Sequence, residues 1–139
     1  MVKQLSVFVE NQKGRLAAIV DLLSSYGINL YALSVADTPD FGILRLIVDD
    51  NDKALKVLQD KNVIASLTDV TVVKMPNTPG GLAEVLWTLA GANINIEYVY
   101  AFVAGSGDGA YVVLRVEDND QAAKVLSEKF PLMNQDDLK

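Results

Sequence analysis

The sequence contains neither cysteine nor histidine. Without cysteine there is no disulfide, no thiolate zinc site and no cysteine nucleophile. Without histidine the chain has neither the commonest general base nor the commonest metal ligand. It also has no run of about 18 apolar residues that would span a membrane, and no basic segment followed by an apolar one at its start. We therefore expect a soluble, cytoplasmic protein without a metal or a cofactor.

Positive charge is scarce as well. There are 12 Lys and Arg residues against 18 Asp and Glu, which gives a net charge of −6. The basic residues are scattered, whereas binding to nucleic acid requires clusters of them. What the sequence does contain is apolar residues, which make up half of its 139 positions. We therefore predict a folded protein that binds neither nucleic acid nor a membrane.

The chain contains an internal repeat. The segment 77–95 matches 11–29 with an offset of 66 residues, and 116–126 matches 48–58 with an offset of 68. The Gly-rich segment 105–109 accommodates the two additional residues. Self-similarity of this kind indicates a tandem repeat. Units of this size bury little surface alone, so we expect the two to share an interface.

Each half of the chain predicts the same order of elements from its apolar periodicity. In the first domain, 1–68, the expected strands are 3–10, 28–37, 41–49 and 63–67, and the expected helices are 15–26 and 50–61. In the second domain, 69–139, the expected strands are 70–76, 94–104 and 109–117, and the expected helices are 81–92 and 119–129. Thr68-Asp69 is predicted to be a linker. Residues 131–134 are predicted to form a short, weak last strand, and the polar tail 135–139 is predicted to be irregular or a brief edge strand.

The order βαββαβ is typical of the ferredoxin-like fold, an α+β fold with an antiparallel sheet and both helices on one face. The strand that starts at Ile94 is apolar on both faces beyond Glu97. Strands of this kind are usually buried on both sides. We therefore expect the face away from the helices to meet another unit or another chain. The alternative is that these apolar residues are simply exposed.

Two acidic blocks, 49–52 and 117–120, are the first candidates for a metal or acid–base site. Each block immediately precedes an expected helix, where carboxylates accept hydrogen bonds from free N–H groups. We therefore interpret them as helix caps. The segment Gly105–Gly109 joins two strands and lacks the Lys-Ser/Thr of a phosphate loop, so it predicts a hairpin tip.

The turns before the first helix of each half are stronger candidates for a binding site. Asn11 and Asn77 lie in these turns, and Asn29 and Asn95 begin the next strands. Free N–H groups at a helix start attract a carboxylate, and Asn side chains offer both donors and acceptors. Together these groups suit a zwitterion. Residue chemistry alone leaves open the alternative that the Asn residues only form turns.

The second half contains the strings Asn77-Thr78-Pro79-Gly80-Gly81-Leu82-Ala83 and Ala92-Asn93-Ile94-Asn95-Ile96. The first half contains Gly14-Arg15-Leu16-Ala17 and Gly27-Ile28-Asn29-Leu30. These strings resemble the ACT domain family, with its turn ending in Pro-Gly, its Leu-Ala helix start and its Asn-Ile-like start of the second strand. The first half departs from this pattern in having Lys13 before Gly14. The resemblance covers nearly the whole chain.

The resemblance implies a regulatory protein without catalytic activity, in which domains pair side by side and ligands, mostly amino acids, bind between them. The implied ligand-binding positions are Asn11, Gly14, Arg15, Leu16, Ile28, Asn29 and Leu30 in the first half, and Asn77, Pro79, Gly80, Gly81, Leu82, Ile94, Asn95 and Ile96 in the second. We expect a homodimer whose regulated partner can be a metabolic enzyme. The alternatives are an interaction subunit that has lost its ligand site and, less favoured, a small enzyme on the same fold.

Overall fold

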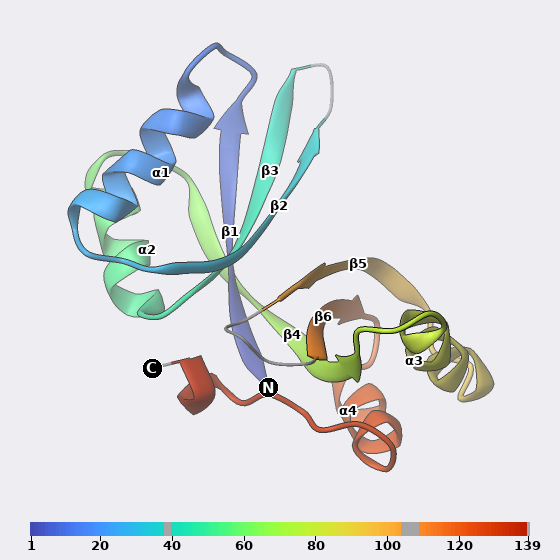
Figure 1. Ribbon diagram of the computed structural model, residues 1–139. Coiled ribbons are helices and arrows are strands. Elements are labelled where there is room, and N and C mark those ends of the chain that lie inside the picture. Colours follow the sequence, from blue (N-terminus) through green and yellow to red (C-terminus); the bar gives the residue numbers. More distant parts are fainter. Residues whose placement is uncertain (38–39, 104–108, 139) are drawn as a thin grey trace. The chain divides into compact units, whose positions relative to one another are not determined.

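The computed structural model of the chain describes residues 1–37, 40–103 and 109–138. Strands and helices alternate in an order that occurs twice (Figure 1). The first half contains β1 (Val2–Glu10), α1 (Arg15–Ser25), β2 (Leu30–Asp37), β3 (Phe41–Val48) and α2 (Asn51–Asp60). The chain continues with β4 (Ala65–Pro76), α3 (Gly81–Gly91), β5 (Ile96–Phe102), β6 (Gly109–Val116), α4 (Asn119–Ser127) and a 3-10 helix at Gln135–Leu138. The predicted α+β class with a repeated ferredoxin-like order is confirmed.

The chain forms two compact units. The amino-terminal unit consists of Lys3–Thr68 with Leu138, and the carboxy-terminal unit consists of Met1–Val2 with Asp69–Asp137. Within the first, the strand order is β2-β3-β1-β4, and within the second it is β4-β6-β5. In the amino-terminal unit α1 and α2 lie on the same face of the strands (Figure 1). β2 and β5 are therefore the edge strands of their units.

The hydrophobic core of each unit lies between its strands and its helices. In the amino-terminal unit, Ile19 and Leu23 of α1 are buried against alternate residues of β1 and β3. In the carboxy-terminal unit, Val85 and Leu89 of α3 are buried against β6 in the same way. Each pair is one helical turn apart, and full burial of such side chains contributes roughly 1.5–3 kcal/mol each. This burial fixes which face of each helix packs against the core, and it therefore fixes the orientation of the first helical turn.

The helices α1 and α3 end with the same backbone geometry. Gly27 follows α1 with a φ of 75°, and Asn93 follows α3 with a φ of 59°. Glycine adopts this left-handed conformation freely, and asparagine adopts it more readily than most other residues. The next amide returns to the helix, since Ile28 N donates to Leu23 O at 3.1 Å, and the equivalent bond after α3 measures 3.0 Å. The left-handed residues Gly27 and Asn93 therefore terminate α1 and α3.

The predicted linker at Thr68-Asp69 is wrong, because one uninterrupted strand, β4, runs through this position. The residues around it are mostly apolar or β-branched, and neither Gly nor Pro interrupts them before Pro76. The boundary between the two units therefore falls within a strand.

The end of the chain is more ordered than its polar sequence predicts. Leu132 forms a single bridge with Val73, in place of a full last strand. The 3-10 helix follows, and its last residue, Leu138, is only 2% exposed. Tyr31 Oη donates a hydrogen bond to the Leu138 carbonyl at 2.9 Å. The prediction of a weak last strand is confirmed, whereas the prediction of an irregular tail is wrong.

Two predicted features lie partly outside the described residues. They are the hairpin tip at 105–109 and the end of the strand 94–104. Among the residues that the structure does describe, no helix combines the length and the apolar character that crossing a membrane requires.

Candidate functional site

The turns that precede α1 and α3 have the same conformation. Gly14 and Gly80 stand at the N-cap positions with φ values of 79° and 88°, and neither helix start has a side-chain cap. A side chain at either position would strain the backbone. Gly81 is required for a different reason, because a Cβ there would lie 2.3 Å from the Pro76 carbonyl oxygen. The Gly-Gly pair therefore lets the backbone of the second turn close tightly.

The starts of α2 and α4 differ from these turns. Asp50 Oδ1 accepts a hydrogen bond from Lys53 N, and Asp118 Oδ1 accepts one from Gln121 N, both at 3.1 Å. The prediction that the acidic blocks cap helices is confirmed for these two residues. α2 and α4 thus supply their own carboxylate, whereas the first turns of α1 and α3 leave N–H groups that an external carboxylate can satisfy.

Asn29 and Asn95, at the starts of β2 and β5, are held in place by hydrogen bonds of their backbone groups. Asn29 N donates to Asp49 Oδ1 at 3.1 Å, and Asp49 N donates to the Asn29 carbonyl at 3.2 Å. Glu117 N donates to the Asn95 carbonyl at 3.4 Å. The side chains of Asn29 and Asn95 are exposed. They are therefore accessible to a ligand.

The other predicted positions differ in what they can offer. Ile28 is buried, and Leu30, Ile94 and Ile96 pack against the cores of their units, so these four support the backbone rather than present a side chain. Arg15 is half-buried, and its Nε has no hydrogen-bond partner among the described residues. Gly81 is buried. The remaining positions are exposed, namely Asn11, Gly14, Leu16, Asn77, Pro79, Gly80 and Leu82.

Within one unit, the predicted turn and the predicted strand start lie at opposite ends of the first helix. α1 has 11 residues, and a helix rises about 1.5 Å per residue, which separates its ends by roughly 16 Å. In Figure 1 the β1–α1 turn lies at one end of the unit and the connection from α1 to β2 lies at the other. The structure therefore does not bring Asn11 together with Asn29 inside a unit, and the same holds for Asn77 and Asn95 on either side of α3.

Two separate cavities reflect this division. A cavity of about 360 Å³ lies beside the first turn and is lined by Asn11, Leu16 and residues of β1, β2 and β3. A cavity of about 630 Å³ lies beside the start of β5 and is lined by Met1, Asp69, Asn93, Ile94, Asn95, Glu117, Asp118, Asn119, Asp120 and Gln121. The first cavity contains the predicted positions Asn11 and Leu16, and the second contains Ile94 and Asn95.

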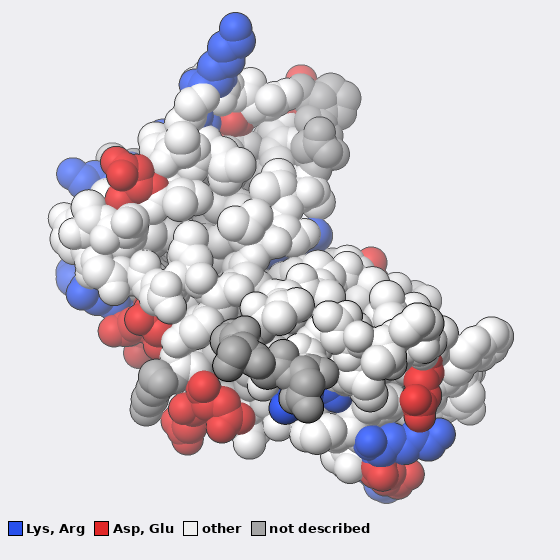
Figure 2. Space-filling model, in the orientation of Figure 1, with Lys and Arg blue, Asp and Glu red and all other residues white. Residues whose placement is uncertain are grey.

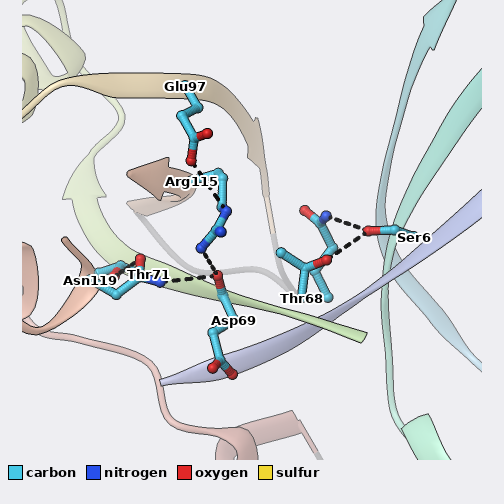
Figure 3. Close-up of polar contacts among 8 residues, drawn as sticks. Ser6, Thr68, Asp69, Thr71, Glu97, Arg115 and Asn119 are labelled. Carbon is cyan, nitrogen blue, oxygen red and sulfur yellow. Dashed lines mark hydrogen bonds and ion pairs between the residues drawn. The ribbon is translucent and has the colours of Figure 1, made fainter. Parts of the chain in front are cut away.

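The cavity beside β5 is acidic, because Asp69, Glu117 and Asp120 line it. The carbonyl of Asp69 is fixed by Arg115 Nη1 at 3.2 Å and Asn119 Nδ2 at 3.3 Å (Figure 3). On the face that Figure 2 shows, Lys and Arg are scattered between Asp and Glu. An acidic cavity favours the positively charged end of a ligand.

Sequence reasoning missed Asp69 and Arg115 as parts of this region. The available signal was the difference between the two halves, since Lys3 stands in the first half where Asp69 stands in the second.

The family of the chain is identified by one comparison. The model of the ACT domain pair matches residues 1–139. A protein from Bacteroides thetaiotaomicron of known structure is 44% identical, with a TM-score of 0.91, and the match covers 99% of this chain and 94% of that one. No curated protein matches the sequence.

Two more distant structures share the fold. The regulatory subunits of aspartate kinase from Thermus thermophilus, in a ligand-free form, and from Thermus flavus are each 20% identical to this chain. Their TM-scores are 0.67 and 0.62, and the matches cover 91% of this chain and 91% and 90% of theirs.

Proposed function

The chain belongs to the ACT domain pair family, and from this premise we propose that it is a regulatory protein without catalytic activity that binds an amino acid between ACT domains. Two proteins with the same fold are regulatory subunits of aspartate kinase. By analogy, the partner that responds to the ligand is a metabolic enzyme. The two ACT domains are residues 1–68 and 69–139.

The observation that carries the proposal is the separation of the two half-sites by the length of the first helix in each unit. A complete site then combines the turn of one domain with the start of the second strand of another. Pairing of domains along the edge strands β2 and β5 supplies such a combination. Exposed apolar side chains along both edges, Leu33 and Val35 on β2 and Val99 on β5, support this arrangement.

The chemistry of the two half-sites fits the two ends of an amino acid. The uncapped starts of α1 and α3 offer N–H groups and a positive helix end to the α-carboxylate. The exposed Asn side chains at the start of the second strands offer acceptors to the α-ammonium group, and the carboxylates beside Asn95 favour the same group.

Thermal denaturation against each of the 20 amino acids at millimolar concentration tests the proposal. A ligand present at 100 times its Kd stabilises the folded protein by about 2.7 kcal/mol, which raises the midpoint visibly. We expect a selective shift that Asn95→Ala or Asn77→Ala reduces, with the ligand-free midpoint unchanged. Shifts that remain in both variants would remove the assigned site. If no amino acid shifts the midpoint, the amino-acid proposal itself fails.

One observation favours the interaction subunit as the second candidate. Trp87 on α3 is 76% exposed, one helical turn after the exposed Ala83. The equivalent of Trp87 in α1 is Asp21. Exposed aromatic side chains are enriched where proteins bind each other. An unchanged melting profile with all amino acids, together with weaker binding of a partner by Trp87→Ala, would favour this candidate.

A further inference from the structure

The two units share a backbone frame at the far end of their first strands. Phe8 N donates to Ile64 O at 2.9 Å, and Lys74 N donates to Pro131 O at 2.8 Å. Across the sheet, Glu10 pairs with Phe41 in the first unit and Pro76 pairs with Gly109 in the second. Lys74 is therefore the structural counterpart of Phe8, and Gly109 is the counterpart of Phe41.

The side chains on this common frame are very different. In the amino-terminal unit the rings of Phe8 and Phe41 stack with their centroids 4.7 Å apart. In the carboxy-terminal unit the stem of Lys74 crosses Gly109, so closely that a Cβ on the glycine would lie 2.9 Å from Lys74 Cε. The carboxy-terminal unit thus has a lysine and a glycine where the amino-terminal unit has two stacked aromatic rings.

A cavity of about 540 Å³ opens at this place in the carboxy-terminal unit. We call it the lysine cavity, and its lining residues are Lys74, Met75, Pro76, Glu84, Gly109, Lys129, Phe130 and Pro131. Phe130 is buried and packs with the core of the unit, so one wall of the cavity is rigid and apolar. The hydrogen bond between Lys74 and Pro131 fixes another wall.

Three charged residues line the lysine cavity, namely the half-buried Lys74 and the exposed Lys129 and Glu84. Within the part of the chain that the structure describes, none of the three forms an ion pair with a neighbour or with one another. An unpaired ammonium group that is partly shielded from water attracts a carboxylate more strongly than a fully solvated one, and among the two lysines this applies to the half-buried Lys74. Two lysines in one cavity stand out in a chain with a net charge of −6.

We propose that the lysine cavity is a second ligand site, which binds a small dicarboxylate and fits an acidic amino acid best. Its two carboxylates meet Lys74 and Lys129, and its ammonium group meets Glu84. The two positive residues and the one negative residue of the cavity are complementary to the two carboxylates and the one ammonium group of such a ligand. The site uses none of the Asn residues assigned above, so it is independent of the proposed function.

Calorimetric titration of the whole chain with four probes tests the ligand class. The probes are L-glutamate, glutarate, L-glutamine and inorganic phosphate. We expect L-glutamate to bind most tightly, because only it offers two carboxylates and an ammonium group. Added salt should weaken its binding, since the Debye length falls from about 10 Å at 0.1 M to about 3 Å at 1 M. Phosphate binding as tightly as L-glutamate would overturn the ligand class.

Variants test the position of the site. Lys74→Gln and Lys129→Gln should each weaken L-glutamate binding about tenfold or more, as expected for the loss of one charged hydrogen bond. Lys61→Gln is the matched control, because Lys61 is the counterpart of Lys129 in the first half. Glu84→Gln should abolish the preference for L-glutamate over glutarate. Lys74→Arg should retain binding.

Two results would overturn the proposal. One is L-glutamate affinity that stays unchanged in both Lys74→Gln and Lys129→Gln while the ligand-free melting midpoint also stays unchanged. The other is loss of L-glutamate binding in Asn77→Ala or Asn95→Ala with full binding in the lysine variants, because this would place the ligand at the site between ACT domains. The proposed function would survive either result.

Discussion

At the scale of single residues, the backbone of the two first turns depends on glycines with different tasks. Gly14 and Gly80 adopt a left-handed backbone, and their surroundings are open to a Cβ. Gly81 has an ordinary backbone but no room, since the Pro76 carbonyl would lie 2.3 Å from its Cβ. A substitution at Gly81 must therefore move backbone, which costs more than moving the end of a flexible side chain.

We expect Gly81→Ala to destabilise the protein by about 1–3 kcal/mol, the usual cost of overpacking. Urea denaturation followed by circular dichroism measures this free energy of unfolding. The matched control is Gly91→Ala in the same helix, where a Cβ meets nothing within 4 Å. The control should be neutral or stabilise by up to about 1 kcal/mol, because alanine is the better helix former. Equal effects at the two positions would contradict the close approach to Pro76.

Residue patterns predicted the turns well and the lysine cavity not at all. The glycines and the Asn residues are visible in the sequence because both halves carry them at a constant offset. The replacement of Phe8 and Phe41 by Lys74 and Gly109 has meaning only once the strand register places the two members of each set on neighbouring strands, two residues apart from direct pairing. Register is a property of the folded sheet, and periodicity along one strand does not contain it.

At the scale of elements, the four helices fall into two classes by how they begin. α2 and α4 start with an Asp side chain on a backbone N–H group, and α1 and α3 start without a side-chain cap. The second class is the one that the proposed function uses, because an uncapped helix start can accept a ligand carboxylate. The continuity of β4 through Thr68-Asp69 could not be found from local patterns, because a continuous strand and two strands with a polar joint have the same alternation.

We expect Asp118→Ala to destabilise the protein by about 1 kcal/mol through loss of the α4 cap. Asp118→Asn keeps an acceptor for Gln121 N and should cost much less. Thermal denaturation of both variants at one protein concentration compares them. If the two variants lose equal stability, the charge of Asp118 rather than its hydrogen bond would be what supports the helix.

At the scale of the whole molecule, the function that we propose makes ligand binding depend on how domains pair. Neither the turn nor the start of the second strand is a complete zwitterion site in our proposal, because each offers partners for only one charged group. Edge strands present free N–H and C=O groups to any second strand. The exposed Leu33 and Val99 lie on the two edges, β2 and β5.

We therefore expect the double variant Leu33→Lys, Val99→Lys to lose self-association and amino-acid binding together while it stays folded. Lysine on an edge strand opposes pairing through charge and hydration. Ile64→Lys is the control, since Ile64 is even more exposed and lies on neither edge strand. Sedimentation velocity reports association, circular dichroism reports folding, and calorimetry reports binding. A monomeric double variant that binds with the affinity of the unmodified protein would mean that one copy of the chain completes the site by itself. Pairing would then serve the regulated partner rather than the ligand.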